Sequence, residues 1–338
     1  MADLPFATWL VMLDGKDMTD KLNPRLLSAS ITEKRAEEAD QLDIVLQDAD
    51  GLLELPRPGV ELEISMGWQR GAGLPLGLVH KGRFRVDEAK WSGALDIVTI
   101  RARSADFTDA FRVRRERSFV GKSLRDVLTA IAGENGLGTA IDAALGGKTI
   151  PALGPGAKSD AALLMLLGKR FDAMATVKAG KLIFAPIGKG KAPGGGTIPT
   201  VTIDRADTNG AEYERIEREN YGGVIAVWHD KATGRRQEVQ VGGSGESDAK
   251  PKRIRKTYAN EADARQAAEA EDSRLTRAKA KLSFTLPLGR PDIYPETPVT
   301  VKGFKAEINA RKWVVAEPVH TMDGGGGLFS KLMLEAVG

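Results

Sequence analysis

Two short stretches of the sequence carry residue types that can bind phosphate. Gly121-Lys122-Ser123 and Gly147-Lys148-Thr149 match the end of a P-loop, in which backbone N–H groups and a lysine surround the phosphates of a nucleotide. A P-loop also needs a glycine five residues before the second glycine of its motif, where the chain turns. Glu116 and Asp142 occupy that position here, and a carboxylate there would repel phosphate. We therefore predict that neither stretch binds a nucleotide.

A helix start explains the first stretch better than a phosphate site does. Ser123 is a favourable N-cap, and Asp126 follows at the spacing of an acidic capping box. An apolar stripe with the spacing i, i+3, i+4, i+7 then indicates one buried helix face, formed by Leu124, Val127, Leu128 and Ile131.

The sequence also lacks the residue patterns of a metal site or of an acid–base catalytic pair. The three histidines, His80, His229 and His320, stand far apart without metal-ligand spacing, and the chain has no cysteine. Glu61 and Glu63 could resemble the carboxylate pair of a glycosidase, but any solvent-facing strand produces the same spacing. We therefore predict a protein that is not an enzyme and that holds no metal and no cofactor.

Two basic runs keep a nucleic-acid function open as an alternative. The runs consist of Arg112, Arg114, Arg115 and Arg117, and of Lys250, Lys252, Arg253, Arg255 and Lys256. Single-stranded nucleic acid is usually bound with interleaved aromatic rings for base stacking, and neither run has a series of them. The pattern favours solvated loops or salt-bridging subunit surfaces over a nucleic-acid-binding adaptor. A carbohydrate-binding module is a further alternative.

The composition is that of an ordinary globular chain. The 338 residues are 42% hydrophobic and 28% charged, which is enough apolar material for about two domains. Lys and Arg number 49 and Asp and Glu 46, so the charges nearly cancel. The longest strongly apolar run, 161–167, is far too short for a membrane helix. The first residues lack the basic segment of a signal peptide, so we expect folding in the cytoplasm.

Hydrophobic periodicity divides the chain into three parts. Period-two alternation dominates residues 1–105, as in the segment VELEISM, and predicts a small antiparallel barrel. Residues 106–197 form an α/β domain with two short helices, which begin at Ser123 and Ser159. Strands return over residues 198–338, together with one helix at about 260–280. The fold class predicted is mainly β with an α+β insert.

The two β-rich parts share an order of local features. Pro58 leads into VELEISM and Gly67, and Pro298 leads into VTV and Gly303. The stretch GRFRVDEAKW then parallels ARKWVVAEPVH, and one closing strand follows each of them. We interpret this as an internal repeat, in which two related β-barrels flank the α/β domain.

Several segments, taken together, resemble the late control D family of phage tail hub proteins. The stretch GKSLRDVLTAIAGENGL is similar to a helical segment of that family, and KSDAALLMLLGKRFDAMATVKAGKLIFAP is similar to the next. The latter also occurs in the base of type VI secretion spike proteins. YGGVIAVWHD and KWVVAEPVHTMDGGGGLFSKLMLEAV resemble the C-terminal β-region of the family. Gly168 and Lys169 depart from it, because the family commonly has Leu-Ala there.

The resemblance implies a structural role in a contractile phage tail or a phage-like particle. It implies a homotrimer whose three pairs of barrels make a pseudo-sixfold ring between the hexameric tail tube and a trimeric central spike. Baseplate wedge proteins and the tape-measure protein are further implied partners, and DNA passes the axial channel only in transit. The expected location is the tail baseplate of the virion, assembled in the host cytoplasm, with no membrane-spanning segment and a spike made by a separate chain.

The sequence also predicts which residues carry these roles. Charged residues on the wet faces of the first strands are candidates for the channel lining or for the subunit seams: Glu61, Glu63, Arg83, Arg85, Arg101 and Arg103. The predicted core and cap residues are Leu62, Ile64, Ser123, Leu124, Leu128, Ile131, Ser159, Leu163, Leu167 and Trp313, with Val60, Val127, Leu166 and Val315 also expected to be buried.

Overall fold

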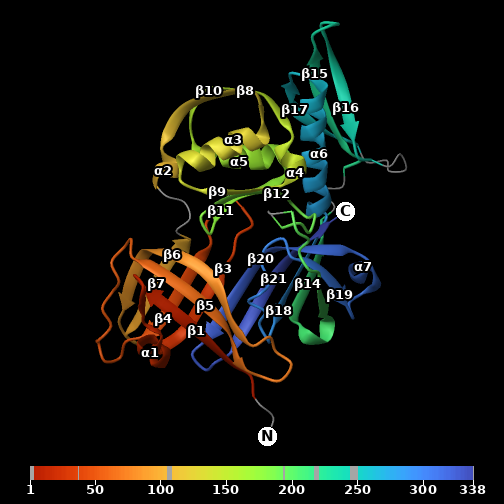
Figure 1. Ribbon diagram of the computed structural model, residues 1–338. Coiled ribbons are helices and arrows are strands. Elements are labelled where there is room, and N and C mark those ends of the chain that lie inside the picture. The colour runs from red at the N-terminus through yellow and green to blue at the C-terminus, as the bar shows by residue number, and fades with distance from the viewer. Residues whose placement is uncertain are drawn as a thin grey trace.

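A computed structural model describes residues 4–36, 38–104, 109–192, 195–216, 221–243 and 250–337. Two β-rich units lie side by side in the lower half of Figure 1, and an α/β domain and a helical insert lie above them. The fold is mainly β with an α+β part, which confirms the predicted fold class. Each of the four parts has its own cluster of buried apolar side chains.

The N-terminal β-unit is a curled sheet that encloses the first of these clusters. Its strands occur in the order β3-β4-β7-β6-β5-β1. They are β1 (Phe6–Leu13), β3 (Leu26–Thr32), β4 (Gln41–Gln47), β5 (Glu61–Arg70), β6 (Gly77–Ser92) and β7 (Ile97–Ser104). Strand β2 (Lys16–Asp17) forms a hairpin with β1, and the short helices α1 (Thr19–Leu22) and η1 (Asn23–Arg25) follow it. The predicted alternation holds in the first half of β5, where Leu62 and Ile64 are buried, whereas residues 65–68 are all buried.

The C-terminal β-unit repeats this strand order. Its strands occur in the order β14-β18-β21-β20-β19-β13. If the strands of the two units are matched one by one in chain order, this is the same order as in the N-terminal β-unit. The elements are β13 (Val201–Asp204), η2 (Arg205–Asp207), β14 (Asn209–Arg215), β18 (Ala280–Leu286), β19 (Pro298–Lys302), α7 (Ala306–Asn309), β20 (Lys312–Asp323) and β21 (Leu328–Val337). In this correspondence β5, which contains most of VELEISM, matches β19, which contains PVTV.

One ladder joins the two β-units into a continuous sheet. Strand β3 pairs with the second half of β20, with Ser28 opposite Asp323 and Thr32 opposite Val319. One pairing departs from the expected antiparallel arrangement, because β13 runs parallel to β19 whereas β1 runs antiparallel to β5. The long intervening chain between β13 and β19 supplies the crossover that a parallel pair needs.

The α/β domain, which we call the middle domain, lies between the two units along the chain. It consists of α2 (Asp109–Arg112), β8 (Arg114–Ser123), α3 (Leu124–Glu134), β9 (Gly138–Ile141), α4 (Ala143–Gly146), β10 (Thr149–Ser159), α5 (Asp160–Phe171), β11 (Ala173–Lys178) and β12 (Lys181–Pro186). Helices α3 and α5 begin with hydroxyl caps. Ser123 Oγ accepts from the N–H of Asp126 at 3.1 Å, and Ser159 Oγ accepts from the N–H of Ala162 at 3.2 Å.

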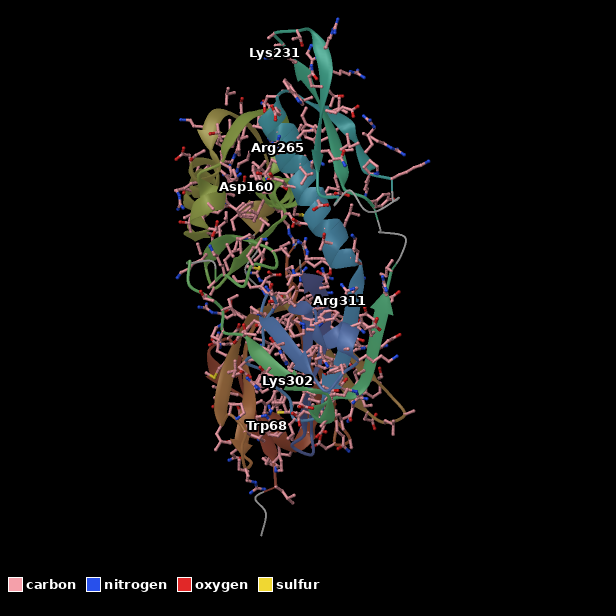
Figure 2. All side chains as sticks on the ribbon, turned by 90° about the vertical axis from the view of Figure 1, so that its right-hand side faces the viewer. Trp68, Asp160, Lys231, Arg265, Lys302 and Arg311 are labelled. Carbon is pink, nitrogen blue, oxygen red and sulfur yellow. The ribbon has the colours of Figure 1, made fainter. Side chains whose placement is uncertain are left out.

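An insert interrupts the C-terminal β-unit between β14 and β18. It contains β15 (Val224–Asp230), β16 (Arg235–Val241), β17 (Lys252–Tyr258) and α6 (Glu261–Ala278). Figure 2 shows α6 running along the middle domain down to the C-terminal β-unit. Two ion pairs hold α6 against the end of α5: Arg170 with Asp263 at 2.7 Å, and Arg277 with Asp172 at 2.7 Å.

Most of the expected core residues are buried, and one clear exception lies on α5. Leu166 is 41% exposed, although it was expected in the core, and Val60 is only half-buried. Helix α5 is apolar on nearly every side, but the core of the middle domain covers only the side that carries Leu163, Leu164 and Leu167. The remaining predicted core residues are buried: Leu62, Ile64, Leu124, Val127, Leu128, Ile131, Leu163, Leu167, Trp313 and Val315.

Candidate assembly surfaces and the junction of the two β-units

The six charged residues predicted for the channel or the seams lie together on the outer face of the N-terminal β-unit. They come from three neighbouring strands: Glu61 and Glu63 from β5, Arg83 and Arg85 from β6, Arg101 and Arg103 from β7. The register places opposite charges across the strands, with Glu61 opposite Arg85 and Glu63 opposite Arg83. Arg85 also stands opposite Arg103, so two like charges adjoin on this face.

The ion pairs on this face are exposed. Arg83 is 3.5 Å from Glu61, and Arg103 is 2.9 Å from Asp87. Arg101 lies 3.4 Å from Asp43. Such solvated pairs are worth about 0–1 kcal/mol each. The face is therefore a hydrated surface of mixed charge, on which Glu61 pairs with Arg83 and Glu63 lies 3.6 Å from His80.

A buried polar cluster lies where the two β-units meet. We call it the junction cluster. It consists of the buried Glu33, Lys81, His320 and Ser330, and of Tyr294, which is partly exposed and covers them. Lys81 Nζ donates to Glu33 Oε2 at 2.7 Å and to the carbonyl of Pro291 at 2.9 Å. His320 Nε2 is 3.3 Å from the same Glu33 oxygen, and its Nδ1 is 2.7 Å from Ser330 Oγ. Lys81 Nζ also lies 4.1 Å from the centre of the Tyr294 ring, a cation–π distance.

Burial and charge set the ionisation of this cluster. Burial lowers the pKa of His320 despite the adjacent Glu33, so His320 is neutral at pH 7. Burial also lowers the pKa of Lys81. Burial alone would raise the pKa of Glu33, but the Lys81 charge and His320 outweigh it and the net pKa falls. Burial raises the pKa of Tyr294 to about 12. The contact between Lys81 and Glu33 therefore offsets part of the free-energy cost of removing the two charged groups from water.

The connection from β3 to β4, residues 33–40, extends this network to the middle domain. Lys178 Nζ of β11 is 2.8 Å from Asp40 Oδ2, and the backbone N–H of Lys34 donates to Asp40 Oδ1 at 2.7 Å. Arg35 lies 2.6 Å from Glu296 and 2.7 Å from Glu335, both in the C-terminal β-unit. Burial raises the pKa of Asp40 and that of Glu296. This one connection thus contacts three parts of the molecule.

The structure offers no metal centre in the part of the chain that it describes. No three His, Asp or Glu side chains gather there in a metal-binding arrangement. Of the three histidines, His320 is fully buried in the junction cluster, while His80 is largely exposed beside Glu63. Among the described residues, no helix is long and apolar enough to cross a membrane.

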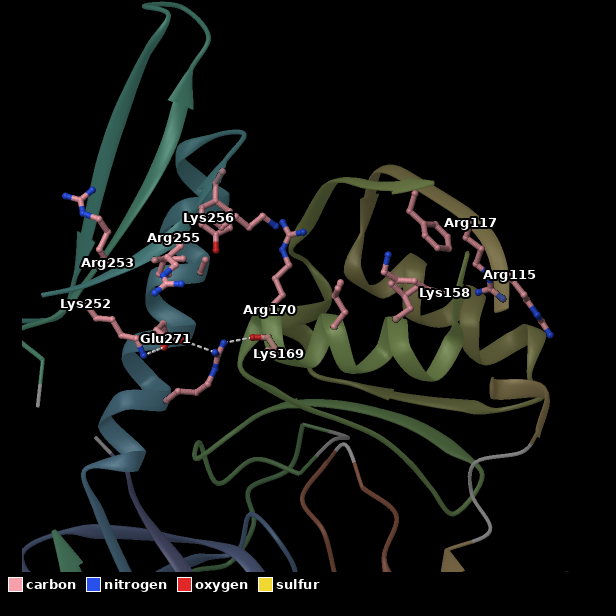
Figure 3. A pocket seen from close by; sticks show the side chains of 17 residues that line it. Arg115, Arg117, Lys158, Lys169, Arg170, Lys252, Arg253, Arg255, Lys256 and Glu271 are labelled. Carbon is pink, nitrogen blue, oxygen red and sulfur yellow. Dashed lines mark hydrogen bonds and ion pairs between the residues drawn. The ribbon is translucent and has the colours of Figure 1, made fainter. Parts of the chain in front are cut away.

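Residues of the two basic runs line the same groove, although more than a hundred residues separate the runs in sequence. They lie on strands β8 and β17 rather than in solvated loops, and these strands form opposite walls of one groove (Figure 3). Lys250 precedes β17, and Arg112 ends α2 and lines a different depression. The sequence shows the charge of each run but carries no sign that the two adjoin.

Solved structures of phage tail proteins share this fold. The 43 kDa tail protein of prophage MuSo2 from Shewanella oneidensis aligns with a TM-score of 0.68 at 14% identity, over 96% of this chain and 97% of that one. An Escherichia coli component of the type VI secretion system, itself described as similar to tail proteins of bacteriophage T4, aligns with a TM-score of 0.56 at 10% identity, over 93% of this chain and 74% of that one. The fold is thus that of tail proteins.

Sequence comparison makes the assignment narrower. Residues 41–325 match the phage tail baseplate hub (GPD) family, and this chain belongs to that family. The probable baseplate hub protein of Escherichia phage P2 is 37% identical over 94% of this chain and 90% of its own length. That of Escherichia phage 186 is 34% identical with the same coverage of both chains. The predicted resemblance to tail hub proteins is confirmed.

Proposed function

We propose that this chain is the central hub of a contractile phage tail or phage-like particle, and that three copies form its ring. The observation that carries the proposal is the repeated strand order of the two β-units. Three chains with two equivalent units each present six similar modules, which matches a hexameric tail tube on one side and a trimeric spike on the other. Family membership and the tail-protein fold support the same role.

The partners follow from this place in the particle. The hub binds the tail tube protein and a separate central spike protein, and baseplate wedge proteins contact it from outside. Its axial channel admits the tape-measure protein and DNA in transit. The outer face with Glu61, Arg83 and Arg103 lines this channel or the subunit seams, since its hydrated mixed charge gives passing polymers no apolar patch to adhere to. The role is structural, without catalysis, in the tail baseplate of a virion assembled in the host cytoplasm.

Co-expression with the spike protein tests the ring. Native mass measurement of the purified complex should give three hubs with one spike trimer, and a map of the tail tip should place them on the axis between tube and spike. The hub alone is expected to remain a monomer at low concentration, because interfaces that form during assembly are weak in isolation. Six copies per particle, or a position on the outer sheath, would contradict the proposal.

A further inference from the structure

A basic groove of about 780 Å³ separates the middle domain from the insert. One wall is formed by β8 and α5, and the other by β17 and α6 (Figure 3). Arg274 closes one end, since it donates to the carbonyl of Lys169 and lies 2.7 Å from Glu271. In Figure 3, Lys256 and Arg170 point toward each other from the two walls, and Arg170 is paired with Asp263 at 2.7 Å.

The cations of this groove exceed the anions that neutralise them. Some are paired: Arg117 lies 3.0 Å from the buried Asp160, and Lys252 lies 2.7 Å from Glu271. Others have no carboxylate partner among the described residues, namely Lys158, Lys169, Arg255 and Lys256. Four uncompensated cations in one concave site raise the local concentration of anionic groups and lower the free energy of binding them.

The floor of the groove is apolar. It includes Leu163 and Leu166 of α5, Ile254 of β17 and Ala267 of α6. Leu166 is 41% exposed because it points to this groove and not to the core of the middle domain. Aliphatic side chains contribute little to holding a phosphate backbone, whereas they contact the apolar side chains of a peptide. The groove thus combines charged walls with a floor that suits aliphatic residues.

Strand β17 adds a backbone edge to the same site. It is the end strand of the sheet β16-β15-β17, so one of its edges has no ladder partner among the described residues. Its residues from Lys252 to Lys256 line the groove consecutively. The pairing of β17 with β15 is bulged within this run, because residues 254–256 stand opposite Ala226. Regular alternation therefore does not hold there, and consecutive side chains line the groove along the outer edge of β17. Such an edge can accept an extended peptide as an added strand.

We propose that this groove binds an extended acidic segment of a partner protein, in which carboxylates alternate with aliphatic residues. The segment pairs with the edge of β17, its aliphatic side chains contact Leu166 and Ile254, and its carboxylates meet Lys158, Arg255 and Lys256. Nucleic acid fits less well. The groove has only two aromatic rings, and that of Tyr258 already faces Lys256 Nζ at 5.3 Å. The inference does not depend on the ring of three.

Fluorescence anisotropy with three labelled probes tests this inference on the full chain. The probes are a peptide of about 12 residues that alternates Glu and Val, the same peptide with Ser in place of Val, and a single-stranded oligothymidine of equal charge. The Glu–Val peptide should bind tightest, and its binding should weaken with added salt. The triple variant Lys158→Glu, Arg255→Glu, Lys256→Glu should lose at least about tenfold in affinity.

Two control variants separate specific binding from general attraction to a basic protein. Lys302→Glu, Lys305→Glu, Lys331→Glu makes the same change of charge at exposed positions outside the groove and should bind the peptide like the parent chain. Leu166→Ser should weaken the Glu–Val peptide several-fold and leave the Glu–Ser peptide unchanged. Circular dichroism checks that each variant is folded.

Three results would overturn the inference. Tighter binding of the oligothymidine, unaffected by Leu166→Ser, would make the groove a nucleic-acid site. Self-association of the parent chain that the triple groove variant abolishes would make the occupant a second copy of this protein. If the groove triple variant and the control triple variant bind each probe with the same affinity, the groove has no ligand of this class.

Discussion

The two β-units share one strand order, and their largest difference lies in one connection. Between β3 and β4 the N-terminal β-unit has the short stretch 33–40, while between β14 and β18 the C-terminal β-unit carries the whole β15–α6 insert. The short connection holds Glu33, Arg35 and Asp40, which bind the parts of the molecule together. The long one provides a wall of the basic groove. The same connection thus joins the parts of the molecule in one unit and forms a wall of the groove in the other.

The edges of the two units differ as well. Strand β3 pairs with β20 of the other unit, whereas its counterpart β14 ends the sheet and has no second partner among the described residues. The second half of β20 corresponds to the second half of β6, whose residues 88–92 pair with β7 but have no partner in β5. In the proposed ring, the same contact would recur between β14 of one chain and β6 of the next.

The largest expected effect comes from breaking the junction between the units. In Lys81→Ala, the buried Glu33 carboxylate loses its ion pair, and the free energy of unfolding should fall by about 3–5 kcal/mol in denaturant titrations. Arg83→Ala, two residues along the same strand, removes only an exposed pair and should cost less than about 1 kcal/mol. The double variant Glu33→Gln, Lys81→Met should recover part of the loss. Equal stability of the two single variants would contradict a structural role for the cluster.

Matched core substitutions test whether the two units unfold together. Leu42→Ala in β4 and Leu282→Ala in its counterpart β18 both remove a buried side chain and should each cost about 2–5 kcal/mol. Since the β3–β20 ladder makes one sheet of both units, each variant should shift the same transition, seen alike by tryptophan fluorescence and circular dichroism. Two separate transitions, with each variant shifting one, would show that the units are independent domains.

A seam substitution tests the equivalence of the edges. Trp91 lies on the β6 segment 88–92, which pairs with β7 on one side and has no partner among the described residues on the other. Its side chain is 50% exposed, and in the ring it would meet β14 of the next chain. Trp91→Asp should weaken trimer formation on the spike by about 2 kcal/mol, the threshold for an interface hot spot, without loss of monomer stability. Leu95→Asp, at an exposed residue in the following turn, is the control. Unchanged assembly of the Trp91 variant in native mass measurement would break the proposed correspondence of β3 with β14.

Local patterns in the sequence reveal much of this architecture. Alternation along β5 and the caps at Ser123, Ser159 and Asn260 are readable because each depends on neighbours within a few residues. Strand β8 is not readable as a strand with one dry face, since its side chains are exposed or half-buried and its pairing with β10 holds it.

The sites are harder to predict because they are assembled from distant elements. Glu33, Lys81 and His320 come from three separate strands or connections, and only the fold brings them together. One signal was present, since His320 occupies an inward position of β20 between the buried Pro318 and Met322. A polar residue at such a position requires a buried partner. Likewise, the apolar run of α5 indicates a second contact surface, and Leu166 provides it.

The smallest expected effect is a pH dependence of stability that comes from His320. His320 is buried in the join between the units, and its pKa in the folded protein lies below the ordinary value of 6.5, because burial disfavours the charged ring. Below about pH 6.5 the unfolded chain therefore binds a proton that the folded chain does not, and stability falls by up to about 1.4 kcal/mol per pH unit.

His320→Gln, which can keep contacts with Ser330 and the Ile293 carbonyl, should remove this contribution. The difference in unfolding free energy between parent and variant should then change between pH 7 and pH 5, in favour of the variant at low pH. Taking the difference cancels the opposite contributions of Asp40 and Glu296, whose pKa values burial raises. His80→Gln is the matched control, because it replaces an exposed histidine outside the junction cluster. The difference in unfolding free energy between the parent and His320→Gln could instead stay constant between pH 7 and pH 5. That result would mean that the join between the β-units accommodates the charged imidazole.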